Sequence, residues 1–333
     1  MGLFQGSVRR PPSGWVSFSE GAGQSLRNLR GVLRRILLTL ADQKWIYRII
    51  VGNAIFRHMA FRFVAGETLQ DAVEAARRLN QKGIFSTLDL LGENVNTEAE
   101  ARAACQHYVD AIDALGDGDA NNVSLKLTLM GLDISHELCM ENMRRILDAA
   151  RARDTFVRID MEGTPYTQVT IDIFSRLWQE YKNVGIVLQS YLYRSEQDVA
   201  LANAMGARVR LCKGAYAEPP DLAFPKKSDV DANYNRLAER LILEGNYPGL
   251  ATHDEAIIEH VKAFVRERNI PLDRFEFQML YGIRRDLQEG LVSEGFRVRV
   301  YIPYGNAWYP YFMRRLAERP ANVLFFLTSL LGR

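Results

Sequence analysis

Cysteine is scarce in this chain of 333 residues, and the three that occur, Cys105, Cys139 and Cys212, lie far apart. An odd number at such spacing argues against a disulfide framework and a CxxC metal site, and it suits a reducing cytoplasm. The net charge is only +2, so we expect no nucleic-acid partner. No apolar run approaches the ~20 residues that cross a bilayer, and the N-terminus lacks the charged start and apolar core of a signal peptide. The sequence therefore predicts a cytoplasmic protein that is not integral to a membrane.

Several motifs that identify a chemistry are also missing. There is no GxSxG nucleophile elbow, and the five histidines include no HxH or HExxH pair, so we predict no metal site. No GxGxxG stands between a predicted strand and a helix, which argues against a doubly wound dinucleotide-binding sheet. The functional residues must therefore be found from the fold.

The chain divides into three parts by composition. Residues 1–25 are rich in Gly, Ser and Pro, and we interpret them as a mobile tail. Residues 26–66 form a helical segment that includes "LRNLRGVLRRILLTL", in which arginines alternate with leucines and isoleucines. This segment either rests on an anionic membrane surface or packs its apolar face on the same chain. Residues 67–333 have a different, repeating pattern.

This repeating pattern alternates amphipathic helical stretches with short β-rich runs. We count eight runs, at residues 84–90, 123–128, 156–161, 184–190, 208–213, 249–252, 274–279 and 297–302. Alternating β and α units imply a parallel sheet, and eight of them in about 250 residues fit a closed (β/α)8 barrel. We therefore predict a TIM-type barrel with extra N-terminal helices and a C-terminal helix on its mouth.

Within these runs polar and apolar residues alternate, so one face of each strand is polar. The apolar face must meet the helix ring, which leaves the polar face inside the barrel. Its most C-terminal members should converge on the mouth, where such barrels keep their sites; these are Asp89, Lys126, Asp160, Gln189, Arg210, His253, Gln278 and Tyr301. Polar residues nearer the floor, namely Arg158, Arg208, Glu276 and Arg297, are expected to form structural ion pairs.

Cations are in surplus among the candidates: Lys126, Arg210, Lys213, Arg314 and Arg315. They suggest anions in the mouth, such as a carboxylate substrate and a phosphate-bearing cofactor. In the stretch "YPYFMRRLAERP" (309–320), helical spacing brings Tyr311 to both arginines and both arginines to Glu318. Taken alone, this stretch favours a solvated helix face.

Many separate motifs resemble the monofunctional bacterial proline dehydrogenases, in the same order, over roughly residues 45 to 333. They include "LDLLGENV", "FVRIDMEG", "GIVLQSYLYRSEQD", "RVRLCKGAY", "RFEFQMLYGIR" and "VYIPYGNAWYPYFMRRLAERPAN". The resemblance implies an FAD-containing (β/α)8 barrel that oxidises L-proline to Δ1-pyrroline-5-carboxylate and passes electrons to membrane quinone. It also implies peripheral association with the inner face of the cell membrane, and a separate pyrroline-5-carboxylate dehydrogenase as a candidate partner. Cys212 is a departure, because the family usually has Val there.

The resemblance also implies roles for single residues. Arg314, Arg315 and Lys126 would hold the proline carboxylate, Tyr301 and Tyr311 would wall its ring, and Tyr216 and Leu280 would close over it. Asp160 and Arg210 would be the catalytic residues, with Arg210 beside the flavin. Flavin contacts would come from Met161, Gln189, Cys212, Lys213, Gly214, Thr252, His253 and Glu318, and an ion pair between Glu93 and Arg314 would form a gate.

Two alternatives come from other functional classes. Lys126 or Lys213 could form a Schiff base in an aldolase-like barrel. The protein could also be a flavin-holding membrane scaffold without turnover, which only the basic N-terminal segment supports.

Overall fold

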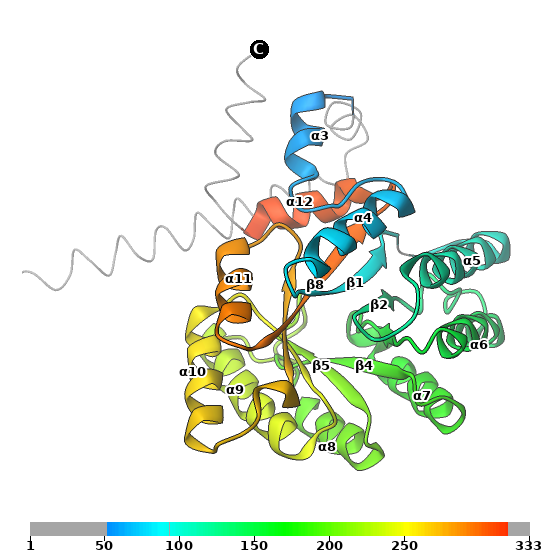
Figure 1. The fold of residues 1–333 in the computed structure, drawn as a ribbon. Coiled ribbons are helices and arrows are strands. Elements are labelled where there is room, and N and C mark those ends of the chain that lie inside the picture. The colour runs from blue at the N-terminus through cyan, green and yellow to red at the C-terminus, as the bar shows by residue number, and fades with distance from the viewer. Residues whose placement is uncertain (1–51, 93, 319–333) are drawn as a thin grey trace, which may run out of the picture. The chain divides into compact units, whose positions relative to one another are not determined.

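The computed structural model describes residues 52–92 and 94–318 (Figure 1). The predicted tail, residues 26–51 of the helical segment and Glu93 lie outside the described residues. By their contacts the residues fall into two units. One is the continuous stretch His58–Trp308, and the other contains residues 52–57 and 309–318 of the described chain.

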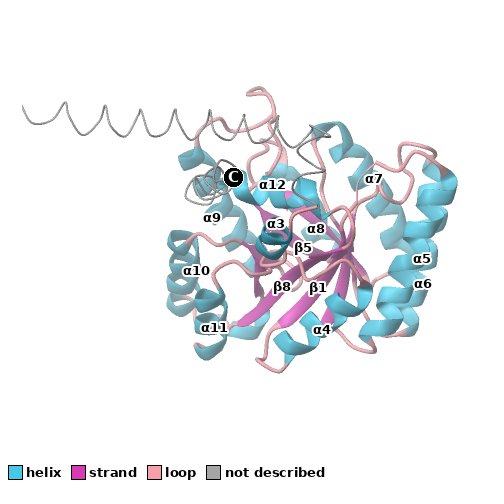
Figure 2. Cartoon of the chain, turned by 90° about the horizontal axis from the view of Figure 1, so that it is seen from above, coloured by secondary structure: helices cyan, strands magenta, loops and turns pink. Residues whose placement is uncertain are grey.

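The unit His58–Trp308 is a closed barrel of eight parallel strands paired in chain order, which confirms the predicted (β/α)8 fold. The strands are β1 (Phe85–Leu90), β2 (Asn121–Leu125), β3 (Val157–Ile159), β4 (Val184–Gln189), β5 (Arg208–Cys212), β6 (Gly249–Ala251), β7 (Glu276–Leu280) and β8 (Arg297–Tyr304). Each predicted run overlaps one of them. Figure 2 shows the strands in magenta, with cyan helices of the barrel around them.

Helices connect the strands, as the amphipathic stretches predict. They are α5 (Glu98–Leu115), α6 (His136–Ala152), α7 (Thr164–Glu180), α8 (Ser195–Met205), α9 (Lys227–Glu244), α10 (Glu255–Glu267) and α11 (Arg285–Ser293), while α4 (Leu69–Asn80) leads into β1. The chain also forms α3 (Ala54–Ala60), a 3-10 turn (Leu272–Arg274) and α12 (Trp308–Glu318). None of the described helices is both long and apolar enough to span a lipid bilayer.

Side chains at the N-terminal residues of these helices explain why several of them begin where they do. Thr68 and Thr97 form capping boxes with Asp71 and Glu100, the third residues of α4 and α5. Asp254 accepts a hydrogen bond from the backbone N–H of Ala256 at the start of α10. Each cap satisfies backbone N–H groups that have no partner inside the helix.

The polar strand faces meet inside the barrel and form a chain of hydrogen bonds. Arg210 donates to Gln278, Gln278 donates to Glu276 over 2.5 Å, and Arg299 donates to Glu276 over 2.7 Å. Arg299 also donates to the backbone carbonyl of Ser86, at 2.9 Å. We call this series, from Arg210 to Arg299, the axial chain.

Three of the four residues expected to pair inside the barrel near its floor form ion pairs, but only the pair of Glu276 and Arg299 is buried. Glu276 pairs with Arg299, Arg208 with Asp119 at 2.7 Å, and Arg297 with Asp273 at 3.8 Å.

Arg158 is different, and the prediction was wrong for it. Its Nη1 donates to the backbone carbonyls of Ile186 and Arg208, at 3.3 and 2.6 Å, and no carboxylate among the described residues forms an ion pair with it. Its guanidinium lies 4.8 Å from the ring centre of Phe156. Backbone carbonyls and an aromatic face thus replace the expected acid. The sequence could not predict these partners, because backbone oxygens offer no sequence signal.

Gly185 leaves space for the hydrogen bond between Arg158 and the Arg208 carbonyl, so substitution of Gly185 tests this packing. A Cβ added there would lie 2.5 Å from the Arg208 carbonyl oxygen and 2.7 Å from Arg158 Nη1. Gly185→Ala is therefore expected to lower the free energy of unfolding by about 1–3 kcal/mol through overpacking. Gly290→Ala in α11 is the matched control, since nothing lies within 4 Å of its added Cβ; it should raise stability by up to about 1 kcal/mol. Urea unfolding measures both, and equal stability of the two variants would contradict the packing account.

Candidate active site

The eight side chains predicted for the mouth all lie at or near the carboxyl ends of successive strands. Asp89, Gln189, Arg210, Gln278 and Tyr301 belong to β1, β4, β5, β7 and β8. Lys126, Asp160 and His253 follow within two residues of the ends of β2, β3 and β6. The closed barrel brings these ends into one ring, so residues up to 212 positions apart in sequence can share a site.

Asp160 is the centre of this ring. Its Oδ1 accepts hydrogen bonds from Ser124 Oγ at 2.6 Å and from Arg210 Nη1 at 2.8 Å, and its Oδ2 accepts one from the Tyr301 hydroxyl at 2.7 Å. The Arg210 guanidinium also lies 5.2 Å from the ring centre of Tyr301. Burial and the neighbouring Asp160 raise the pKa of the Tyr301 phenol well above its usual range, so it remains a hydrogen-bond donor. The Asp160 carboxylate thus holds both the Arg210 guanidinium and the Tyr301 side chain in place.

Asp89 is a second, more deeply buried carboxyl of the mouth. Its Oδ1 lies 3.5 Å from Lys126 Nζ, and its side chain is only 2% exposed. Burial raises the pKa of Asp89 to about 6, against the opposing effect of Lys126 and with a further rise from Asp160. The mouth therefore contains a carboxyl group that changes charge just below neutral pH.

The ends of β4 and β5 also contribute to the mouth. Gln189 Nε2 donates to the backbone carbonyl of Glu162 over 2.9 Å, and the Cys212 carbonyl accepts from the N–H of Ser190 over 2.8 Å. Burial raises the pKa of the Cys212 thiol to about 12, so the thiol stays neutral. All three cysteines are free thiols, as their number and spacing predict.

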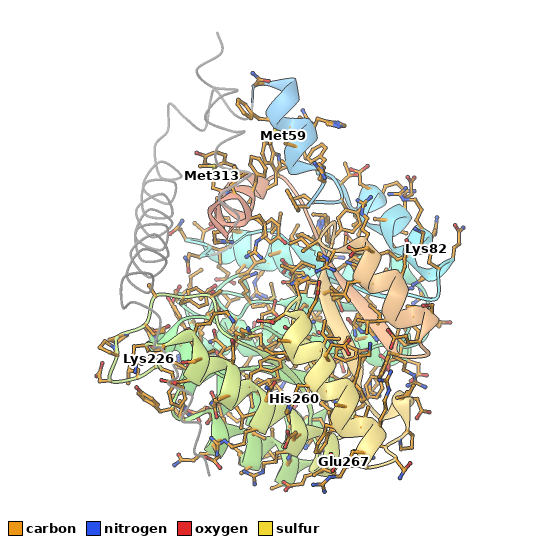
Figure 3. The ribbon with its side chains drawn as sticks, turned by 90° about the vertical axis from the view of Figure 1, so that its left-hand side faces the viewer. Met59, Lys82, Lys226, His260, Glu267 and Met313 are labelled. Atoms are coloured by element: carbon orange, nitrogen blue, oxygen red, sulfur yellow. The ribbon has the colours of Figure 1, made fainter. Side chains whose placement is uncertain are left out.

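Lys213 is held by two carboxylates, which reduces the cation surplus that the sequence indicated. Its Nζ lies 2.6 Å from Asp231 Oδ1 of α9 and 2.8 Å from Asp254 Oδ2 at the start of α10. Lys227 pairs with the same two acids, and the bond from Lys213 is the main cause that lowers the pKa of Asp254 to about 2. Figure 3 labels Lys226 in the loop that leads into α9, next to Lys227. Because α9 and α10 begin beside the end of β5, these acids meet Lys213 from distant positions in the sequence.

The ends of β6 and β7 are tied together by His253. Its Nε2 accepts a hydrogen bond from the backbone N–H of Leu280 over 2.9 Å. A neutral His253 therefore carries its proton on Nδ1. Thr252 Oγ1 accepts from the N–H of Asp254 over 3.1 Å. Leu280 and His253, predicted as a substrate contact and a flavin contact, are thus neighbours.

The predicted contacts Met161, Gly214 and Tyr216 lie on the loops that follow β3 and β5. Met161 is buried, whereas Tyr216 is 39% exposed. Gly214 has a φ of +120°, and an added Cβ would lie 2.4 Å from the Tyr191 ring. A residue with a side chain would be strained there, because both its backbone angle and the neighbouring ring exclude it.

The residues predicted on the C-terminal helix belong to α12. Within this helix the Arg315 guanidinium lies 5.3 Å from the ring centre of Tyr311, as the i, i+4 spacing predicts. Arg314 precedes it on the same helix. The side chain of Glu318 and the whole of Glu93 lie outside what the structure describes. The carboxylate clamp and the gate between Glu93 and Arg314 therefore stay predictions.

Sequence reasoning missed several polar residues that support the mouth. Thr128 donates to Glu162 over 2.7 Å, and Tyr191 and Thr164 both donate to Glu218. Their partners are 27 to 54 residues away, so spacing carries no signal. The one available hint is that Glu162 directly follows the mouth residues Asp160 and Met161.

Comparison with known proteins connects this geometry to a family. The proline dehydrogenase family profile matches residues 72–327. Proline dehydrogenase 1 of Bacillus subtilis (strain 168) is 42% identical over 303 residues, which cover 91% of this chain and 100% of that protein. Proline dehydrogenase of Deinococcus radiodurans is 42% identical over 304 residues, covering 90% of this chain and 97% of that one.

Solved structures lead to the same family. Proline utilization A (PutA) from Bdellovibrio bacteriovorus, inactivated by N-propargylglycine, superposes with a TM-score of 0.77 at 25% identity. The match covers 91% of this chain but only 38% of that longer chain. From the matched profile, the near full-length relatives and the shared barrel, we conclude that this chain belongs to the proline dehydrogenase family.

Proposed function

We propose that this chain oxidises L-proline to Δ1-pyrroline-5-carboxylate at the mouth of its barrel, using FAD. The observation that carries the proposal is the family match over the whole barrel, whose mouth holds the ordered group of Asp160, Arg210 and Tyr301. Oxidation by this route needs positioned charges and no protein nucleophile. The family match favours it over an aldolase-like barrel or a scaffold without turnover.

The residues at the ends of β4, β5 and β6 suit a flavin. Gln189 offers an amide, Arg210 a guanidinium, Thr252 a hydroxyl and His253 an imidazole, which complement the carbonyl oxygens and ring nitrogens of an isoalloxazine. FAD bound there would supply the electron acceptor, taking a hydride from proline C5. The remaining proposed contacts are Met161, Cys212, Lys213, Gly214 and Glu318.

The chain's own groups would orient the substrate and favour the charge that develops. Arg210, fixed by Asp160, provides a buried cation whose field favours negative charge arriving nearby. Lys126, together with Arg314 and Arg315, would bind the proline carboxylate. Tyr301 and Tyr311 would wall the pyrrolidine ring, with Tyr216 and Leu280 closing over it. Glu93 would pair with Arg314 as a gate.

The acceptor for the electrons and the place of the reaction are also proposals. We infer that electrons pass to a membrane quinone, and that the protein associates peripherally with the inner face of the cell membrane. The imine product contains a latent aldehyde, so a separate pyrroline-5-carboxylate dehydrogenase is the expected partner. Support for such coupling comes from the PutA relatives, one of which, from Escherichia coli, is named a bifunctional protein.

A visible spectrum tests the proposed reaction. Purified protein is expected to be yellow, and anaerobic L-proline should bleach the flavin band. D-proline is the matched control, because it presents the same groups in the opposite configuration and should bleach the band far more slowly. A protein saturated with FAD whose spectrum ignores L-proline would refute the function. A colourless protein that borohydride traps with substrate would favour the aldolase alternative.

A further inference from the structure

The loop between β5 and α9 carries Tyr216, and its far half is paired with the loop that follows β4. The Phe224 N–H donates to the Tyr191 carbonyl over 2.8 Å, and the Tyr193 N–H donates to the Leu222 carbonyl over 3.1 Å. The rings of Tyr193 and Phe224 pack edge to face, with centres 4.6 Å apart. Backbone pairing therefore fixes the stretch from 222 to 224. The stretch that contains Tyr216 is fixed differently.

Glu218 connects this nearer stretch to two other loops. Its Oε1 accepts hydrogen bonds from the Thr164 N–H at 2.9 Å and the Tyr191 hydroxyl at 3.3 Å. Its Oε2 accepts one from the Thr164 hydroxyl. The N-cap of α7 is Gly163, which has no side chain to satisfy the first N–H groups, so Glu218 supplies the cap from another loop. Its negative charge is also favourable at a helix N-terminus.

Tyr216 is reached from Glu218 by two short paths. The first runs through the Tyr191 hydroxyl, which donates to Glu218 over 3.3 Å; burial and Glu218 raise the pKa of Tyr191, and the nearby backbone of Tyr216 acts in the opposite direction. The second runs through Gly163, where an added Cβ would lie 3.5 Å from Glu218 Oε1 and 3.8 Å from Tyr216 Cδ1. The Tyr216 ring thus lies beside the helix end that Glu218 caps.

We propose that Glu218 is a positioning residue for proline oxidation, which holds Tyr216 at the mouth through Tyr191 and the N-terminus of α7. The inference rests on the proposed function, in which Tyr216 closes over the substrate. Glu218 acts through Tyr216, so its loss should weaken the binding of proline and leave the rate of the bound complex nearly unchanged.

A double-mutant cycle on the FAD-loaded, full-length protein tests this assignment. Anaerobic titration of flavin absorbance gives the Kd of L-proline, and stopped-flow bleaching gives the limiting rate. Glu218→Ala should raise Kd roughly tenfold, which corresponds to about 1.4 kcal/mol, and change the limiting rate less than about twofold. In a Tyr216→Ala background the same substitution should change Kd less than about twofold, because coupled residues are non-additive. An unchanged Kd in Glu218→Ala, or an equal effect in both backgrounds, would overturn the proposal.

Three further variants separate positioning from loss of stability. Glu218→Gln keeps an acceptor for the Thr164 N–H and should restore most of the affinity. Tyr191→Phe removes the bridging hydroxyl and should raise Kd in the same direction as Glu218→Ala; it also keeps the test decisive if that variant does not fold. Thr68→Ala removes the capping box of α4 and should lower the melting temperature without changing Kd. An equal rise of Kd in Thr68→Ala would reduce Glu218 to a stability residue and overturn the inference.

The wild-type protein is measured first. If L-proline does not bleach its flavin, the proposed function fails, and this result is distinct from any difference among the variants.

Discussion

Arg315→Ala is expected to weaken L-proline binding by at least about 30-fold. If Arg314 and Arg315 hold the carboxylate in a site closed to water, loss of one leaves a buried anion without a charge-assisted partner, which costs roughly 2–5 kcal/mol. At about 1.4 kcal/mol per tenfold change in Kd, the lower bound gives that factor. Arg315→Lys should recover only part, because an ammonium cannot reproduce the planar guanidinium fork. Titration of proline against flavin absorbance measures the effect.

The control for this prediction is Arg78→Ala in α4, which removes an arginine whose side chain is 60% exposed. It should leave Kd unchanged. Arg314 should also differ from Glu93: if the two form the gate, Glu93→Ala should damage binding less than Arg314→Ala, which removes a carboxylate ligand as well. If Arg315→Ala binds proline as tightly as the wild type, α12 presents an ordinary solvated face and the clamp is wrong.

The second large effect should appear in the pH dependence of stability. The pKa of Asp89 is raised from 3.8 to about 6 in the folded protein, chiefly by burial. A raised pKa means that the stabilisation is present below the unfolded value and is lost as pH rises through the folded value. At about 1.36 kcal/mol per pKa unit, the protein should lose about 2 kcal/mol between pH 4 and pH 7 from this group, because the unfolded carboxyl is already partly ionised at pH 4.

Asp89→Asn removes that titration. Its free energy of unfolding relative to the wild type should therefore rise by about 2 kcal/mol from pH 4 to pH 7. Urea unfolding at a series of pH values gives the difference curve. Asp117→Asn, at a side chain 74% exposed, controls for loss of a carboxylate as such. A flat difference curve for Asp89→Asn would mean that Lys126 keeps Asp89 ionised over the whole range.

Much of the barrel could be predicted because strand and helix periods are local properties of the sequence. The polar alternation in "FVRIDM" and "RVRLCK" placed Asp160 and Arg210 on the inner face, and the closed topology brought them within 2.8 Å. What strand periodicity cannot predict is which partner a polar group finds. Lys213 meets two acids at later helices, and among the described residues Arg158 meets backbone oxygens and an aromatic ring in place of an acid.

The C-terminal helix shows that spacing predicts contacts within one element but not contacts with other elements. Helical spacing correctly placed Tyr311 and Arg315 beside each other, because both belong to one element. The spacing carries no information on which ligand or strand end these side chains meet. Those roles come from the resemblance to the family, and the binding experiments above decide them.

The axial chain has a consequence for how this barrel can change over time. Arg210, Gln278, Glu276 and Arg299 each satisfy the next, so replacing one member leaves a buried polar group without its partner. A half-satisfied buried network is less stable than either the complete network or an apolar core. Selection should therefore remove single substitutions in the axial chain. Simultaneous replacement of several of its members is rare. We therefore expect the residues of the axial chain to be conserved or replaced together during evolution. Residues on the exposed helix faces are expected to change one at a time.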